Sequence, residues 1–99
     1  MDLATLTAKA NEALSQTGFD KSIKFDFGSV GKLLLDGANS VATNEDGAAD
    51  ATVNVDWNDF LKLAKGKLDP AMAMMSGKLK VNGDMSALMQ LQSLFSKLV

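Results

Sequence analysis

The spacing of apolar residues changes along this chain from a helical period to an alternating one, and later back again. Residues 2–16 place their apolar side chains on one face of a helix, and Gly18 offers a stop at its C-terminal end. In residues 22–27 every second side chain is apolar, which indicates a strand with one face buried. The chain is therefore expected to pack helices against a sheet.

Four further segments are predicted to be strands. Residues 32–36 follow the first strand after a short turn, which predicts an antiparallel hairpin. Residues 39–44 are a weaker third candidate, and 51–57 and 78–82 are the fourth and fifth. Leu34 lies on the opposite face from its apolar neighbours, which suggests that this part of the sheet is covered on both sides.

Helical spacing returns after the fourth strand. Asp56 can cap a helix that Gly66 ends, and Asp69-Pro70 opens a short helix that Gly77 closes. A last helix is predicted from about residue 85 to 98. The order of these elements predicts an α+β domain in which helices pack on a mostly antiparallel five-stranded sheet.

Length and composition bound the organisation of the chain. Ninety-nine residues support one modest core, and no linker or repeat divides them, so we expect a single domain over residues 1–99. The start of the chain lacks the pattern of a signal peptide, and the longest apolar run, residues 71–75, is too short to span a bilayer. We therefore expect a cytoplasmic protein.

The lysines do not form a nucleic-acid surface. The net charge is −2, and no basic block is present. Lys62, Lys65 and Lys67 come nearest to a cluster, and the favoured interpretation is a solvated helix face. Lys78 and Lys80 could contact anionic head groups, although an ordinary solvated strand face is again favoured.

Most enzyme mechanisms are excluded by the absence of cysteine, histidine, arginine and tyrosine. No thiolate or histidine-dependent nucleophile can form, and no sulfur or imidazole metal site. Asp26 and Asp36 remain as acid–base candidates, but both alternate with apolar residues and are expected to face solvent. Trp57 is interpreted as a packing anchor. We therefore expect no enzymatic activity, no catalytic residue, no metal and no cofactor.

The last predicted helix carries more apolar residues than one buried face requires. It could be deeply buried, could face a partner or a second copy, or could line a cavity that holds an apolar ligand. The last third of the chain also contains five methionines, whose flexible thioethers adapt to irregular apolar shapes. For any single one of them, filling a gap in the core is the favoured interpretation. They are Met72, Met74, Met75, Met85 and Met89.

Five motifs follow one another in a distinctive order. They are Ala-Asp-Ala-Thr-Val-Asn-Val at 49–55, Asp-Phe-Leu-Lys-Leu at 59–63, Gly-Lys-Leu-Asp-Pro at 66–70, Gly-Lys-Leu-Lys-Val-Asn-Gly-Asp-Met at 77–85 and Leu-Met-Gln-Leu-Gln at 88–92. Together they closely resemble the sterol carrier protein type two domain, and the resemblance covers most of the chain.

The resemblance implies a five-stranded sheet covered on one face by helices, with an apolar tunnel between sheet and helices. Members of this family bind sterols, fatty acids, fatty acyl-CoA and other lipids, and transfer or present them without chemical conversion. Met74 and Met75 stand where the family often has two aromatic residues, and Gln92 matches a glutamine that can offer a polar contact. The short chain suggests a compact bacterial-type member, for which a sterol is a less natural ligand.

The expected site is an internal pocket for a lipid or another apolar small molecule. Transient contact with a membrane is also expected, and binding to nucleic acid is not. A monomer is favoured over a dimer. An alternative is an accessory domain whose apolar C-terminal helix docks on a partner enzyme and presents a hydrophobic substrate such as a quinone precursor. The residues expected to line the pocket are Phe25, Phe27, Leu33, Leu35, Val53, Phe60, Leu61, Met74, Met75, Met85, Leu88, Met89, Gln92 and Phe95.

Overall fold

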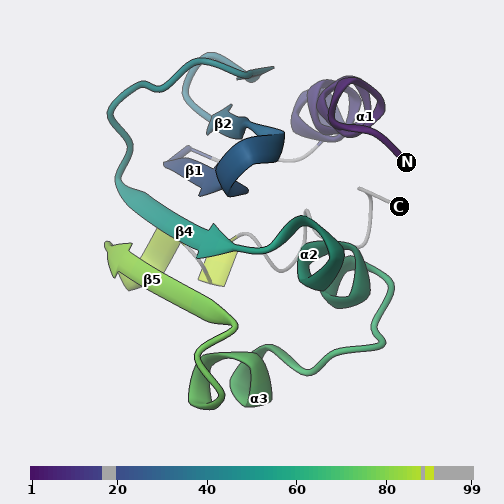
Figure 1. The fold of residues 1–99 in the computed structure, drawn as a ribbon. Coiled ribbons are helices and arrows are strands. Elements are labelled where there is room, and N and C mark those ends of the chain that lie inside the picture. The colour runs from purple at the N-terminus through teal and green to yellow at the C-terminus, as the bar shows by residue number, and fades with distance from the viewer. Residues whose placement is uncertain (17–19, 88, 91–99) are drawn as a thin grey trace.

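The computed structural model describes residues 1–16, 20–87, 89 and 90 of the chain. Its centre is a five-stranded sheet, with helices packed beside it (Figure 1). The elements are α1 (Leu3–Gln16), β1 (Ser22–Asp26), the short 3-10 helix η1 (Gly28–Val30), β2 (Lys32–Asp36), β3 (Val41–Thr43), β4 (Ala51–Val55), α2 (Trp57–Ala64), α3 (Pro70–Met75) and β5 (Leu79–Gly83). Residues 85–87, 89 and 90 are also helical.

The strands lie in the order β3-β2-β1-β4-β5. Three of the four neighbouring pairs are antiparallel, and β1 with β4 is parallel. The α+β class and the mostly antiparallel five-stranded sheet are thus confirmed. The tunnel implied by the family resemblance is not visible among the described residues and stays a prediction.

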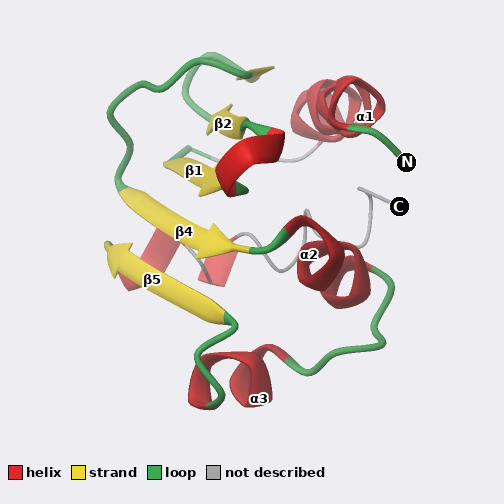
Figure 2. Ribbon diagram, in the orientation of Figure 1, coloured by secondary structure: helices red, strands yellow, loops and turns green. Residues whose placement is uncertain are grey.

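One face of the sheet carries the hydrophobic core. In β1 and β2 buried residues alternate with half-buried ones, as their period of two predicts. The inward side chains of the sheet form one cluster with the buried face of α1, with Phe60 of α2 and with Ala87. Because all these elements contribute to one cluster, the helices that supply it cover the same face, and Figure 2 shows α1 and α2 beside the strands.

The other face of the sheet is partly covered by the loop between β3 and β4. Leu34 is half-buried there, and a Cβ atom added at Gly47 would lie 3.0 Å from its Cδ2 atom. In the same loop Asp46 accepts a hydrogen bond of 2.8 Å from the Lys24 ammonium group. The sheet is therefore covered on both sides at this point, and a loop supplies the outer cover.

Helix α1 is tied to both the core and the edge of the sheet. The helical spacing places five residues on one face. Leu3 is half-buried, and the other four are buried: Leu6, Ala10, Ala13 and Leu14. Asn11 also accepts a hydrogen bond of 2.6 Å from the Ala42 amide and donates one of 3.0 Å to the Ala42 carbonyl. This side chain satisfies backbone groups of β3, the strand at one edge of the sheet, and so protects that edge.

Both Gly-Lys-Leu triplets end a helix in the same way. Gly66 and Gly77 have φ angles of +75° and +79°, in the left-handed region that glycine adopts readily. The amides of Lys67 and Lys78 then donate to carbonyls five residues earlier, at 2.8 and 2.9 Å. This is the Schellman arrangement, and it leaves a lysine just beyond the C-terminus of each helix, where positive charge is favourable.

The N-terminal caps also agree with the sequence. The carboxylate of Asp56 accepts a hydrogen bond from the Asn58 amide, and that of Asp69 accepts one from the Ala71 amide. Proline 70 occupies the first helical position of α3, where its missing N–H leaves no bond unmade. These local signals fix where both helices begin.

Several boundaries differ from the sequence-based expectation: the strands expected at 22–27, 39–44 and 78–82 are β1 at Ser22–Asp26, β3 at Val41–Thr43 and β5 at Leu79–Gly83. Strand β4 ends at Val55, so Trp57 begins α2 instead of ending a strand. The predicted last helix is seen at 85–87, 89 and 90, and its remaining residues lie outside the described part of the chain, as does Gly18. No helix in the described part is long and apolar enough to cross a membrane.

Candidate functional site

An aromatic cluster lies between the sheet and α2. The inward face of β1 and the residue after it supply Phe25 and Phe27, and α2 supplies Phe60 and, one turn earlier, Trp57. The ring of Phe60 lies 5.1 Å from that of Phe25 and 5.0 Å from that of Phe27, both edge to face. Trp57 packs edge to face on Phe27 at 5.0 Å, which supports its interpretation as a packing anchor.

The buried residues around these rings are apolar. No polar or charged residue is buried among the described residues. An apolar interior of this kind can accept hydrocarbon.

The structure brings half of the expected pocket residues into this core. Six of them are at most 4% exposed, and Leu61 is half-buried against the same cluster. The six are Phe25, Phe27, Leu33, Leu35, Val53 and Phe60. Their role as pocket lining stays a prediction.

The methionines occupy a different environment. All six in the chain are exposed, so the expectation that a given methionine fills a gap in the core is wrong for each of the five in the last third of the chain. Among those expected to line the pocket, Met74 is 45%, Met75 85%, Met85 54% and Met89 74% exposed. Leu88, Gln92 and Phe95 lie outside the described residues.

The exposure of the α3 methionines follows from helix geometry. Only Ala73 of this six-residue helix is buried. At about 100° per residue, Met75 lies almost opposite Ala73, while Met72 and Met74 flank it on either side. The exposed fractions follow this order, with 85% for Met75 against 61% and 45% for the other two. A helix this short, with methionine at three of its six positions, cannot bury them all on one face.

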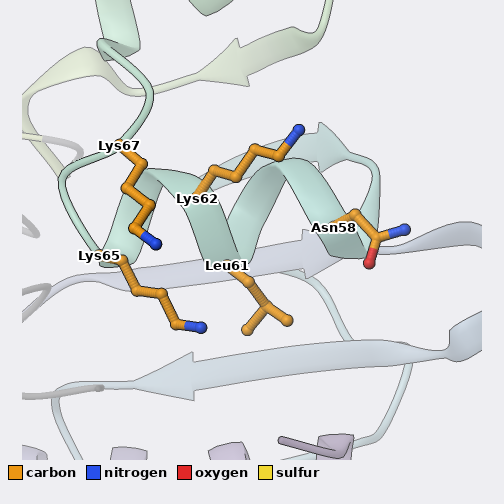
Figure 3. Close-up of a pocket in the computed structure, with 5 residues that line it drawn as sticks. All are labelled: Asn58, Leu61, Lys62, Lys65 and Lys67. Carbon is orange, nitrogen blue, oxygen red and sulfur yellow. The ribbon is translucent and has the colours of Figure 1, made fainter.

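Helix α2 borders an open pocket of about 420 Å³. Figure 3 shows Asn58, Leu61 and three lysines around it, with Lys65 and Lys67 extending in the same direction and Lys62 in the other. The sequence pattern predicted a solvated helix face for these lysines. No pattern in the sequence indicates the pocket, whose lining includes Lys67 from beyond the end of α2.

The two acid–base candidates have structural roles. Asp26 accepts a hydrogen bond of 2.9 Å from the Gly28 amide in the turn after β1. Asp36 accepts bonds from the backbone amide and the side-chain amide of Asn39 in the turn after β2. Both carboxylates alternate with the inward residues of their strands and stabilise turns. No group of three or more potential metal-binding carboxylates occurs among the described residues.

The carboxylates with shifted pKa values lie outside the apolar layer. Hydrogen bonding and charge attraction from Lys24 lower the pKa of Asp46 below its usual 3.8. Hydrogen bonds from Ser86 lower the pKa of Asp84, and those from Thr5 lower the pKa of Asp2. All three are stabilised as surface anions, which is the opposite of the raised pKa that a buried general acid needs.

These features define an α+β domain whose candidate site is an apolar layer between one sheet face and its helices. The chain belongs to the SCP-2 sterol transfer family, whose model matches residues 3–96.

Curated relatives are much longer than this chain. Sterol carrier protein 2 of Homo sapiens is 44% identical over 61 residues, which are 62% of this chain and 11% of the relative. Hydroxysteroid dehydrogenase-like protein 2 of Xenopus tropicalis is 38% identical over 66 residues, which are 66% of this chain and 16% of the relative. The similarity therefore covers one small part of each of these proteins.

Solved structures support the fold over nearly the whole chain. Sterol Carrier Protein-2 from Aedes aegypti, in complex with the C16 fatty acid palmitate, has a TM-score of 0.78 at 23% identity and covers 100% of both chains. The ubiquinone synthesis protein UbiJ-SCP2 has a TM-score of 0.69 at 21% identity and covers 97% of this chain and 94% of that one. At these identities the likeness establishes the fold.

Proposed function

We propose that this protein binds a single-chain lipid, such as a fatty acid, between its sheet and helices, and carries or presents that lipid without converting it. The observation that carries the proposal is the apolar layer around Phe25, Phe27 and Phe60, in which the described residues bury no polar or charged side chain. Membership of the SCP-2 family and the palmitate bound by the Aedes aegypti relative support the same function.

The physical chemistry of burial sets the expected strength of binding. A C16 chain removes about fourteen methylenes from water, a gross gain of about 11 kcal/mol at ~0.8 kcal/mol each. Loss of translational and internal freedom removes several kcal/mol of this. Binding in the micromolar range, with weak selectivity for the head group, is expected.

The proposal assigns no reaction to the domain. The chain has no cysteine or histidine, and Asp26 and Asp36 stabilise turns. The dehydrogenase-like relative carries this similarity in only 16% of its length, so any chemistry it performs is not transferred to this chain.

Native mass spectrometry of the purified protein, followed by solvent extraction, is the first test. We expect a mass shift of a few hundred daltons that resolves into fatty acids or related lipids. A folded protein with a clean unliganded mass that also fails to take up a fluorescent fatty acid would contradict the proposal.

A matched pair of variants tests where the lipid binds. Met89→Glu places a charge at a residue expected to line the pocket, and Met72→Glu places the same charge at an exposed methionine outside that set. Both sites are exposed, so both variants are expected to fold. We expect fatty-acid affinity in solution to fall about tenfold or more for Met89→Glu, because bound hydrocarbon that covers this position would desolvate the carboxylate, and to stay unchanged for Met72→Glu. Equal affinities would remove Met89 from the pocket.

A second candidate is an accessory domain that presents a hydrophobic quinone precursor to a partner enzyme. The likeness to UbiJ-SCP2 and the exposed methionines favour it. Competition between a polyprenylated phenol and palmitate separates the two candidates. Preference for the phenol supports the accessory role, and preference for palmitate supports fatty-acid transport.

A further inference from the structure

Positive charge is concentrated in one segment of this acidic protein. Residues 60–80 contain five lysines and one aspartate, a net charge of +4, whereas the rest of the chain carries −6. The three ion pairs among the described residues join Lys21, Lys24 and Lys32 to acids, and all three lie outside this segment. The lysines of residues 60–80 are therefore available to an external anionic surface.

The same segment carries three exposed methionines, and one of them, Met75 at 85%, is the most exposed of the large apolar side chains among the described residues. Helix α3 lies in its middle and presents Met72, Met74 and Met75 around all but its Ala73 side. Lys67 and Lys78 stand just before and after this helix, each exposed beyond a Schellman turn. Three apolar side chains thus project between two lysines at one end of the molecule, where Figure 1 shows α3 apart from α1 and the β1–β2 hairpin.

We propose that α3 and its flanking lysines dock the protein on an anionic phospholipid bilayer. The methionines enter the boundary between head groups and acyl chains, and the ammonium groups contact lipid phosphates. The inference rests on the proposed lipid-carrying function, since a carrier must meet a membrane to load or release its cargo. The surface is named here the α3 docking surface, formed by Lys67, Met72, Met74, Met75 and Lys78.

The chemistry of these side chains favours a bilayer over a protein partner. Exposed methionines suit a fluid hydrocarbon surface, because their flexible side chains need no complementary shape. Lysine is a point charge on a long stem, which reaches head groups while its methylenes stay among the apolar side chains. The open pocket beside Lys65 and Lys67 gives a phosphate room to approach both ammonium groups.

The charge on the rest of the molecule would orient it on the membrane. An anionic surface attracts residues 60–80 and repels the remainder, whose net charge is −6. The lysine-rich segment ends in β5, which lies at the opposite edge of the sheet from β3. Val41 on β3 is also exposed, at 37%. It offers an exposed apolar control position at the sheet edge opposite β5, the strand that α3 contacts.

The absence of cysteine allows a direct test with single labelled sites. Met72→Cys and Val41→Cys each receive an environment-sensitive fluorophore, and the proteins are mixed with vesicles of phosphatidylcholine containing about 30% phosphatidylglycerol. When vesicles are added, we expect the emission of the label at 72 to shift to the blue and strengthen, and the emission of the label at 41 to stay unchanged. Equal responses at both sites, or a response to pure phosphatidylcholine vesicles of the same size, would overturn the proposal.

The contribution of charge is tested by two double variants that change the net charge equally. Lys67→Gln/Lys78→Gln removes the lysines that flank α3, and we expect vesicle affinity to fall about thirtyfold. Lys21→Gln/Lys24→Gln removes two ion-paired lysines, and a change below about threefold is expected. Added salt should weaken wild-type binding. Equal losses in the two double variants, or no binding of the wild type to anionic vesicles, would overturn the docking surface and favour a protein partner.

Fatty-acid uptake in solution, without vesicles, separates this inference from the proposed function. Neither Lys67 nor Lys78 belongs to the expected pocket, so Lys67→Gln/Lys78→Gln should load fluorescent fatty acid as the wild type does. Loading without any vesicle binding would overturn the docking surface alone. Vesicle binding through position 72 without any loading would overturn the proposed function and leave the docking surface supported.

Discussion

The two ends of this molecule use apolar residues in opposite ways. Around α1, β2 and β3, leucines and alanines are buried, and Asn11 satisfies the backbone of the edge strand. In the segment from α2 to β5, the methionines of α3 are exposed, and the lysines beside them form no ion pair with a described acid. The first region holds the fold together, whereas the second presents apolar and cationic groups to the surroundings.

The difference arises from helix length as much as from composition. Helix α1 has fourteen residues, enough for four buried positions at helical spacing. Helix α3 has six residues and buries one. A helix of fewer than two turns gains little stability by itself and contributes only a small area to a core. Most side chains of α3 are therefore not needed for the core and can contact an external surface.

The largest expected effect compares the two regions directly. Leu6 is fully buried in α1, so Leu6→Ala should lower the free energy of unfolding by about 2–5 kcal/mol. Met75 is 85% exposed, so Met75→Ala should change it by less than about 0.5 kcal/mol. Urea unfolding of both variants and the wild type measures the two values. Comparable losses would mean that α3 is as much a part of the core as α1.

Glycine substitutions sharpen the comparison at the sheet. A Cβ atom at Gly83 would overlap the Asp50 carbonyl oxygen and lie 2.9 Å from the Ala51 Cα atom. Since backbone atoms cannot move aside easily, Gly83→Ala should cost about 2–4 kcal/mol. Gly66→Ala meets nothing within 4 Å and should cost only the strain of its positive φ, about 1–2 kcal/mol. Thermal unfolding gives the order, and a larger loss at Gly66 would be inconsistent with the close approach at Gly83.

Local signals predicted most of these elements. The period of two in residues 22–27 and 32–36 predicted the hairpin, and the caps at Asp56 and Asp69 predicted where two helices begin. Inward-facing strand residues such as Phe25 were correctly expected to be buried. Each of these signals depends on residues within a few positions of one another, so a single sequence is sufficient to read them.

Features that depend on distant contacts were less accessible. The parallel pairing of β1 with β4 and the use of a loop to cover Leu34 depend on the path of the chain after β3. The exposure of Met75 was missed because six residues are too few for a period to distinguish a buried side from an exposed one. The same limit applies to the candidate site, where the family resemblance grouped the methionines with the aromatics, although the aromatics are buried and the methionines are exposed.

The edge of the sheet provides a prediction of intermediate size. Asn11→Ala removes both hydrogen bonds to Ala42 and leaves its amide and carbonyl without that partner. The free energy of unfolding should fall by about 1–3 kcal/mol, because these bonds are partly buried. Hydrogen exchange at the Ala42 amide should accelerate in parallel, and unchanged protection there would show that α1 does not guard this edge. Asn39→Ala, in an exposed turn after β2, is the matched control and should leave exchange at Ala42 unchanged.

The smallest expected effect concerns the ion pair that holds the outer loop. Lys24 lowers the pKa of Asp46 below its usual 3.8, first by a hydrogen bond and then by charge attraction. The pair therefore stabilises the fold fully above pH 3.8, and this contribution is lost as the pH falls through the lower pKa of the folded state. Asp46→Asn should unfold slightly more easily than the wild type at about pH 7, and the difference should shrink as the pH falls below 3.8. Glu45→Gln removes a neighbouring charge that forms no ion pair with a described lysine, and should show a smaller difference at either pH. A difference between Asp46→Asn and the wild type that persists in acid would show that the loop depends on the shape of the Asp46 side chain and not on its charge.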